Sequence, residues 1–336
     1  MEPNNDLLAV LTREGVLVKV SVRYWRGTKK LKPEDLGLKE ADVSDRLISL
    51  GHKRLLPKAA LAGLAVVEGR AHALVESNTF PFLNGIAHFL PNARLEDVIT
   101  KLNEMQQEFW QAKQQFLQQY SSLRRDASVE WRQMADKLVA DPDRLVAVIE
   151  SSFPFADHMD RYYGFDVQMF QIALPGRMEA DLITLAEQRD VIAARSRAAQ
   201  EAGQKIRRGV ETFVADCVAS LREQTAQLCD DMLHSINHSE TGVHQKTLNR
   251  LVRFIDQFKQ MNFVNDTVME EQLENVRKEL LSKSAEEYRD STKDRNRLVQ
   301  GLSQLRNHAH QLAKQDATEL VKRFGQVGVR KFNLAS

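Results

Sequence analysis

The sequence predicts a mainly α-helical protein, with a small N-terminal α+β head followed by a long antiparallel helical stalk. Two observations support this fold class. All eight prolines lie at or before Pro175, and because proline breaks helix interiors, the chain after it is free to form long helices. By contrast, residues 16–23 place a valine at every second position, which is typical of a β-strand. We therefore expect an α+β head domain at residues 1–175 and a coiled-coil stalk at residues 176–336.

The head is expected to contain a short antiparallel sheet. The apolar segment 7–11 and the alternating segment 16–22 predict a hairpin that turns near Arg13–Gly15. A second alternating segment, Phe165–Ile172, predicts another strand, which would pair with this hairpin. Four alternating residues are then expected to face the core: Val16, Val18, Val20 and Val22.

Helical periodicity dominates the rest of the head. Residues 60–77 predict a mostly buried helix, and Leu95–Leu123 predicts a long amphipathic one. Shorter helices are expected at Val129–Val139 and Asp143–Glu150. The apolar segment 80–91 contains two prolines, so we expect it to be a loop.

The stalk is expected to begin with a helix from about residue 177 to residue 235. At 1.5 Å per residue this helix would be ~90 Å long. Its apolar positions, among them Val210, Val214 and Leu221, form a heptad-like seam. A helix of this length is not stable alone in water, so other helices of this chain or another chain must cover the seam.

Three further helices are expected to return antiparallel to the first. They are predicted at Thr247–Met261, at Thr267–Leu281 and in a coiled-coil pattern from Leu298 to Leu320. Residues 282–297 have few apolar positions, which predicts an exposed helix or a joint.

Composition argues against several classes of protein. Lys and Arg number 47 and Asp and Glu number 46, so the formal net charge of +1 gives no general attraction to nucleic acid or to anionic membranes. The longest uncharged apolar run, Ala59–Val67, is too short to cross a bilayer, and stable membrane insertion is not expected. The first residues lack the apolar core of a signal peptide. Cys217 and Cys229 lie too far apart on one predicted helix for a disulfide, so a cytoplasmic location is expected.

The sequence carries no signature of catalysis. It contains neither a Walker A loop nor a G-x-G-x-x-G turn, and both cysteines occupy seam positions. Asp230, His234 and His238 recur every four residues on one helix face, a spacing that can suit a metal. No His-Glu-x-x-His motif is present, and histidines near a helix end also complement the helix dipole. We expect a protein that is not an enzyme and that has no cofactor and no metal site.

A basic segment near the N-terminus is the best candidate for an interaction surface. Six positive residues between positions 19 and 32 have no acidic residue among them, and two aromatic residues lie between them. The candidate residues are Lys19, Arg23, Tyr24, Trp25, Arg26, Lys29, Lys30 and Lys32. Such a segment can neutralise phosphates while an aromatic ring stacks on a base. It can also bind an acidic protein partner, or form only a solvated rim that protects a sheet edge.

Several segments together resemble an uncharacterised bacterial and phage family, catalogued as a domain of unknown function numbered 3150. The resemblance covers roughly the first 175 residues. It is carried by V-x-V-R-Y-W-R-G-T-K-K-L (Val20–Leu31), D-L-G-L (Asp35–Leu38), F-P-F-L-N-G (Phe80–Gly85), the aromatic helix around Phe109–Tyr120 and Y-G-F-D-V-Q-M-F-Q-I (Tyr163–Ile172). The resemblance implies a gene context beside a MoxR-type AAA+ ATPase and a von Willebrand factor A protein, in mobile elements and phage-related islands.

These observations lead to three hypotheses. The first is a non-enzymatic structural or interaction protein, whose stalk mediates self-association or docking and which acts as an accessory or adaptor of such an ATPase. The alternative is a nucleic-acid-binding protein that uses the basic segment 19–32. A weaker alternative is a helical membrane-active effector, although no uncharged hairpin of membrane length is visible.

Overall fold

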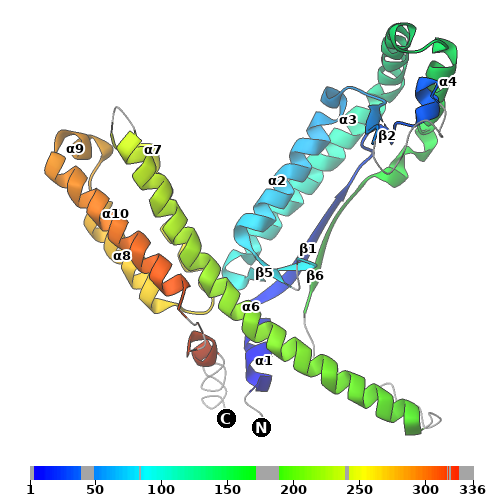
Figure 1. Cartoon of the computed structure of the whole chain (residues 1–336). Coiled ribbons are helices and arrows are strands. Elements are labelled where there is room, and N and C mark those ends of the chain that lie inside the picture. Colours follow the sequence, from blue (N-terminus) through cyan, green and yellow to red (C-terminus); the bar gives the residue numbers. More distant parts are fainter. Residues whose placement is uncertain are drawn as a thin grey trace. The chain divides into compact units, whose positions relative to one another are not determined.

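The computed structural model divides the chain into two compact units (Figure 1). It describes residues 4–38, 49–82, 85–171, 189–238, 242–315, 317 and 319–324. Unit 1 combines residues 1–18, 78–96 and 169–336, and unit 2 combines residues 19–77 and 97–168. This division differs from the expected boundary at residue 175, because apolar residues near the N-terminus belong to the same core as the later helices.

The mainly α-helical fold class is confirmed. The α-helices are α1 (Asn4–Glu14), α2 (Ala62–Asn78), α3 (Asn92–Leu138), α4 (Pro142–Ser152), α6 (Arg189–His238), α7 (Gln245–Met261), α8 (Thr267–Leu280), α9 (Ala285–Asp290) and α10 (Thr292–Ala313). Short 3-10 helices are η1 (Pro33–Leu36), η3 (Lys58–Leu61) and η4 (Ala156–Tyr162). The strands are β1 (Gly15–Arg23), β2 (Thr28–Lys30), β3 (His52–Arg54), β4 (Phe80–Phe82), β5 (Ala87–Pro91) and β6 (Gly164–Phe170).

The larger sheet has four strands in the order β4-β5-β1-β6. The strand predicted at Phe165–Ile172 is present as β6, next to β1 as expected. On its other side β1 pairs antiparallel with β5, with Gly15 opposite Pro91. A Cβ atom at Gly15 would lie 2.4 Å from the Leu90 carbonyl oxygen, so the two strands can approach this closely only at a glycine.

The predicted N-terminal hairpin is wrong, because residues 4–14 form helix α1 rather than a strand. Leu7, Leu8 and Leu11 are buried in the core that α6 shares, and a spacing of three to four residues places them on one helix face. The predicted loop at 80–91 is also wrong, because it holds the antiparallel strands β4 and β5. Strand β5 therefore takes the place beside β1 that the sequence analysis gave to residues 7–11.

Burial along β1 follows the predicted alternation only in part. Val18 and Val22 are buried as expected, whereas Val16 and Val20 are half-buried. Leu17, which was not among the residues predicted to face the core, belongs to the apolar core of unit 1. Both faces of this part of the strand are therefore covered.

Helices α6 and α10 run antiparallel in unit 1 (Figure 1). The Arg295 guanidinium donates to the Ile236 carbonyl near the end of α6, at 2.9 Å. Farther along α10, the Arg222 guanidinium of α6 donates to the Leu312 carbonyl at 2.7 Å. The earlier residue of α10 thus contacts the end of α6, and the later residue contacts its middle. The two helices are therefore antiparallel, as predicted.

Helices α7 and α8 form a second antiparallel pair in the same unit. Lys259 pairs with Glu274 at 2.8 Å, and Arg277 pairs with Asp256 at 2.5 Å. Buried apolar residues from these helices join those of α6 and α10 in one core, among them Leu251, Ile255, Leu273 and Leu302. The predicted segment 282–297 contains α9, whose Tyr288 is buried and donates to the Leu280 carbonyl.

Among the described side chains of α6, those that belong to the core begin in the middle of the helix. Among its described side chains Val210 is the first that is fully buried, and the predicted seam residues Val214, Cys217 and Leu221 follow it into the core. Most described residues from 200 to 209 are exposed. The predicted start of this helix, at residues 177–188, lies outside the described residues.

Helix α3 is one continuous helix of 47 residues, where two were predicted. At 1.5 Å per residue it is ~70 Å long. Ala127 and Ala135 are buried and continue the apolar face past Leu123, where the first predicted helix ended. None of the described helices combines the length and the apolar composition needed to cross a membrane.

A buried ion pair joins the helices of unit 1. Arg222 Nε lies 2.7 Å from Asp266 Oδ2, and both side chains are at least nine-tenths buried. The other carboxylate oxygen of Asp266 accepts from the Met269 amide and caps the N-terminus of α8. Asn262 Oδ1 accepts from the Asp266 amide at 2.8 Å. The pair therefore ties α6 to the α7–α8 corner, while Arg222 also reaches α10.

Replacing Asp266 with alanine removes the only described acidic partner of buried Arg222 and the cap of α8. We expect the free energy of unfolding to fall by about 3–5 kcal/mol, because an uncompensated buried charge remains. Urea unfolding followed by circular dichroism measures this change.

Two further variants make this test specific. Glu274→Gln breaks the exposed Lys259–Glu274 pair and is expected to leave the unfolding midpoint unchanged, because water screens surface pairs. The double variant Arg222→Met, Asp266→Leu removes both charges and is expected to recover most of the stability lost in Asp266→Ala. An Asp266→Ala protein as stable as the wild type would contradict the role of the buried pair.

Candidate functional site

Strands β2 and β3 form a separate two-stranded antiparallel ribbon in unit 2. Thr28 lies opposite Arg54, Lys29 opposite Lys53, and Lys30 opposite His52. Two backbone hydrogen bonds extend the ribbon, from the Leu31 amide to the Gly51 carbonyl at 3.1 Å and from the Leu55 amide to the Gly27 carbonyl at 2.7 Å. We call residues 27–32 and 51–55 the basic ribbon.

A second buried ion pair holds the basic ribbon in place. Lys53 Nζ lies 2.6 Å from Asp35 Oδ2, and both side chains are about 5% exposed. The same carboxylate oxygen accepts from the Lys32 amide at 2.8 Å. In addition, Trp131 Nε1 of α3 donates to the Arg54 carbonyl at 2.9 Å. The inner side of the ribbon is therefore fixed to η1 and to α3.

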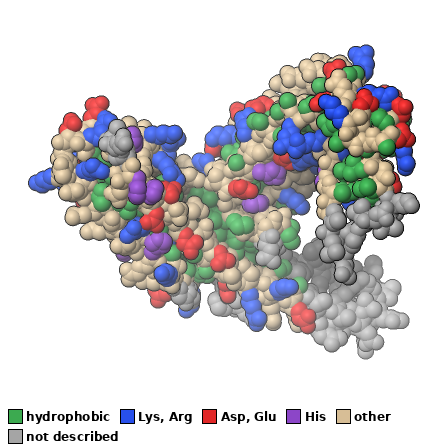
Figure 2. All heavy atoms as spheres, turned by 45° about the horizontal axis from the view of Figure 1, so that its top comes forward, with side chains coloured by type: hydrophobic (Ala, Val, Ile, Leu, Met, Phe, Trp, Pro, Cys, Tyr) green, Lys and Arg blue, Asp and Glu red, His purple; other side chains and the backbone are tan. Residues whose placement is uncertain are grey.

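The basic ribbon carries five exposed basic side chains, of which Lys30, His52 and Arg54 share one face while Lys29 lies opposite Lys53 on the other. These are Lys29, Lys30, Lys32, His52 and Arg54. None of the five forms an ion pair with another described residue of the chain. Figure 2 shows Lys and Arg side chains interspersed with Asp and Glu over the visible face.

Trp25 belongs to the core of unit 2 and is only 6% exposed. Its ring lies 5.9 Å from the ring of Tyr120, in an edge-to-face arrangement, and 6.0–6.2 Å from the rings of Phe116 and Phe153. Apolar burial of this large ring outweighs any use on the surface. In this fold Trp25 presents no free face on which a base could stack.

Tyr24 and Arg26 are engaged with each other and with Glu68. The Arg26 guanidinium lies over the Tyr24 ring, 4.0 Å from its centre, and makes two hydrogen bonds to the Glu68 carboxylate at 2.7 and 2.5 Å. Hydrogen bonding to Arg26 lowers the pKa of Glu68 and burial raises the pKa of Tyr24. The charge of Arg26 is therefore already compensated within unit 2.

Lys19 and Arg23 are exposed on β1 and lie outside the basic ribbon. The Arg23 guanidinium lies against Gly164 of β6, where a Cβ atom would come within 2.9 Å of Nη2. Of the eight candidate residues, three thus share the ribbon: Lys29, Lys30 and Lys32.

The second strand of the ribbon was not predicted from the sequence. His52, Lys53 and Arg54 lie more than twenty positions beyond Lys30, and their short run gave no clear strand signal. The usable signal was a basic triplet between Gly51 and the buried pair Leu55–Leu56, because a glycine and an apolar anchor often flank a short strand.

The histidine pattern on α6 does not form a metal cluster in the structure. Asp230 is engaged by α10, with Arg306 Nη1 at 3.1 Å and His310 Nε2 at 3.7 Å. The rings of His234 and His238 stack with their centres 4.1 Å apart. Within the described ranges, no group of three or more His, Cys, Asp or Glu residues is arranged to hold a metal ion.

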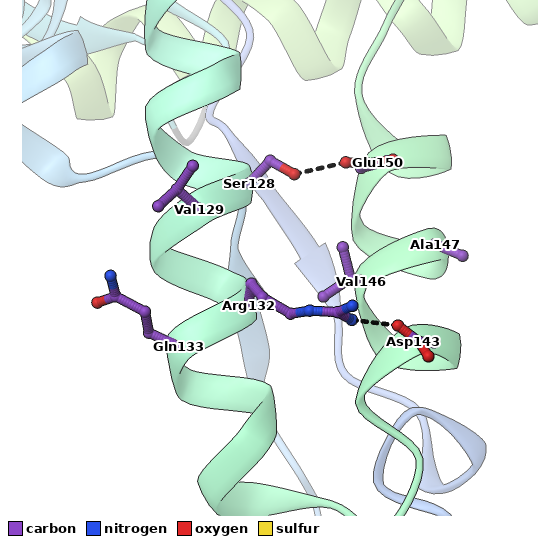
Figure 3. A pocket seen from close by; sticks show the side chains of 8 residues that line it. All are labelled: Ser128, Val129, Arg132, Gln133, Asp143, Val146, Ala147 and Glu150. Atoms are coloured by element: carbon purple, nitrogen blue, oxygen red, sulfur yellow. Dashed lines mark hydrogen bonds and ion pairs between the residues drawn. The ribbon is translucent and has the colours of Figure 1, made fainter.

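A shallow groove of about 440 Å³ lies between α3 and α4 (Figure 3). Arg132 forms an ion pair with Asp143 across it, and Ser128 Oγ donates to Glu150 at 2.5 Å. These interactions use the charged groups of the groove internally, so it offers little for recognising a ligand.

Both cysteines are free and buried in unit 1. Burial raises the pKa of Cys217 well above its usual value and that of Cys229 to about 12. The thiolate, which is the reactive form, is therefore disfavoured at neutral pH.

The fold places this chain in the class of mainly α-helical proteins with a small antiparallel sheet. The family model described as "Protein of unknown function (DUF3150)" matches residues 12–301. The chain belongs to this family, and the match extends well beyond residues 1–175, on which the resemblance rested, into α10. No curated protein and no solved structure matches the chain.

Amine acylation at neutral pH is expected to modify Lys29, Lys30 and Lys32 and to spare Lys53, because only the last is buried and paired. In Asp35→Asn, Lys53 loses its partner and is expected to become reactive. Peptide mass spectrometry reads out each site. Glu34→Gln, on the same short helix, is the matched control and should leave Lys53 protected; equal reactivity of Lys53 in the wild type would contradict the buried pair.

Iodoacetamide at pH 8 is expected to leave Cys229 unmodified in the native protein and to modify it after unfolding in urea. With a pKa of about 12, only about one thiol in ten thousand is ionised at this pH. Because the pKa is raised on folding, this group stabilises the fold below about pH 8.5, and the contribution is lost as the pH rises toward 12. Intact mass measures alkylation, and rapid modification of the native protein would disagree.

Proposed function

We propose that the chain is a non-enzymatic interaction protein that associates through the first half of α6. The observation that supports this most directly is the change of burial along that helix. Apolar residues from Val210 onward lie in the core of unit 1, whereas the described side chains from 200 to 209 are exposed or half-buried. A helix that continues beyond the described helices that cover it gains little stability alone, and the proposed cover is another chain.

The sequence of this exposed part suits a partner helix. In its described part, Ala202 and Ile206 precede Val210 at steps of four residues, and Ile206, which packs partly against the core of unit 1, lies where the covered seam ends. Small side chains at such positions let a second helix approach closely. The interaction proposed here is therefore helix-on-helix packing of a coiled-coil type.

The proposed partner is a AAA+ ATPase of the MoxR type, for which this chain would act as an accessory or adaptor component in the cytoplasm. This part of the proposal rests on the gene context that the family resemblance implies, together with a von Willebrand factor A protein in mobile elements. Self-association of the chain through the same helix is compatible with this role. Both forms of association bury the same seam of α6.

Size-exclusion chromatography with light scattering, over a concentration series and with the ATPase encoded nearest to this gene, tests the proposal. We expect a mass above that of the monomer, alone or with the ATPase. Ala202→Glu places a charge on the seam and is expected to weaken association at least tenfold.

Gln204→Glu is the matched control, because it adds the same charge to the same helix at an exposed position. It should leave association unchanged. A compact monomer at every concentration, with the frictional ratio of a sphere and without binding to the ATPase, would refute the proposal.

A further inference from the structure

We infer that the basic ribbon binds the phosphate backbone of double-stranded nucleic acid, without regard to base sequence. The ligand class is a duplex polyanion, and the residues assigned to it are Lys29, Lys30, Lys32 and Arg54. The inference rests on the ribbon in unit 2, so it stands or falls separately from the association through α6.

Uncompensated charge is the first observation. Across the ribbon Lys29 lies opposite Lys53, and Lys30 lies opposite His52. Opposite residues in an antiparallel pair have Cβ atoms about 4.5–5.5 Å apart, and like charges there are unfavourable. Asp35 compensates Lys53, but the exposed Lys29 and Lys30 have no ion-pair partner among the described residues. An anionic ligand would remove this repulsion.

The ribbon differs in this respect from several other cations of unit 2. Each of these exposed or half-buried cations has an acidic partner: Arg26–Glu68, Arg70–Glu108, Lys101–Asp97, Lys113–Asp160 and Arg132–Asp143. The chain as a whole carries a net charge of only +1. Lys29, Lys30, Lys32 and Arg54, which have no ion-pair partner among the described residues, are therefore gathered on one short ribbon of a chain that is nearly neutral overall.

The shape of the ribbon favours a duplex. The major groove of B-DNA is about 12 Å wide and admits a two-stranded β-ribbon, whose strands lie about 4.8 Å apart. Long basic side chains can then reach phosphates at the groove edge. Because the Asp35–Lys53 pair and Trp131 already fix the inner side, the backbone loses little freedom on binding.

Because the aromatic rings are buried, the ribbon is expected to bind double strands rather than single strands, and to contact phosphates rather than bases. Proteins that hold single strands stack bases on exposed aromatic side chains, and Trp25 and Tyr24 are no more than 9% exposed. Lysine acts as a point charge toward phosphate and carries no base information by that contact. Phosphate contacts alone predict binding that is independent of sequence and no stronger for single strands.

Charge density favours nucleic acid over an acidic protein. A duplex presents one negative charge per about 1.7 Å of its axis and releases counterions when cations bind. Four side chains on one ribbon can each meet a phosphate on such an array. An acidic protein surface would have to supply an equally dense and regular set of carboxylates.

Fluorescence anisotropy of a labelled 20-base-pair DNA duplex of mixed sequence, titrated with the full chain at several salt concentrations, tests the inference. With four phosphate contacts we expect log K to fall with log salt at a slope of about −3 to −4. The triple variant Lys29→Gln, Lys30→Gln, Arg54→Gln is expected to bind at least tenfold more weakly, with a slope shallower by about 2–3.

The control triple variant is Lys137→Gln, Lys246→Gln, Arg253→Gln, which removes the same charge from exposed helix positions. It should keep most of the affinity, and circular dichroism verifies that both triple variants are folded. Absence of salt-dependent binding, or equal loss in both triple variants, would overturn the inference. Displacement of the duplex by polyglutamate as effectively as by unlabelled duplex would also overturn it and would assign the ribbon to an acidic protein.

Discussion

The Arg222–Asp266 ion pair is the interaction on which the helical core of unit 1 depends. A buried charge is tolerated only when its partner stands at the right distance, so the pair fixes how far α6, α8 and α10 lie along one another. Apolar side chains of the core could pack in several registers, because leucine contacts are interchangeable. The ion pair selects one of them, since a slip of one helical turn would leave Arg222 unpaired in an apolar environment.

Unit 2 uses the same device on a smaller scale, with a different outcome. Lys53 and Asp35 form a buried pair that aligns β3 with η1. Lys53 is buried and its charge is compensated by Asp35, whereas the neighbouring cations of the ribbon are exposed to water. The buried pair thus holds the ribbon in place. It also distinguishes Lys53, which is structural, from the exposed lysines of the ribbon, and composition alone does not reveal this difference.

Helices with long, regular apolar faces could be predicted from the sequence. Segments whose pattern of apolar residues fits both a helix and a strand could not. α7, α8 and α10 were predicted because their apolar residues repeat over several turns. The segment 7–11 was misassigned, because a short apolar run fits a strand and a helix equally well and only contact with α6 decides between them. The three-residue β3 was missed since pairing, not periodicity, makes it a strand. For the same reason Trp25 was placed on a surface, although the surrounding rings that bury it come from α3 and from the segment after α4.

Several elements are shared between the two units. β1 begins in unit 1 and ends in unit 2. α3 also crosses from unit 1 into unit 2, near residue 96, and it does so as continuous helix rather than as a loop. The chain therefore passes between the units four times, and neither unit is a continuous piece of sequence. A fragment cut at residue 175 would separate α1, β4 and β5 from the helices that share their core. Studies of this family by truncation would consequently compare incomplete halves, whereas point substitutions leave both units whole.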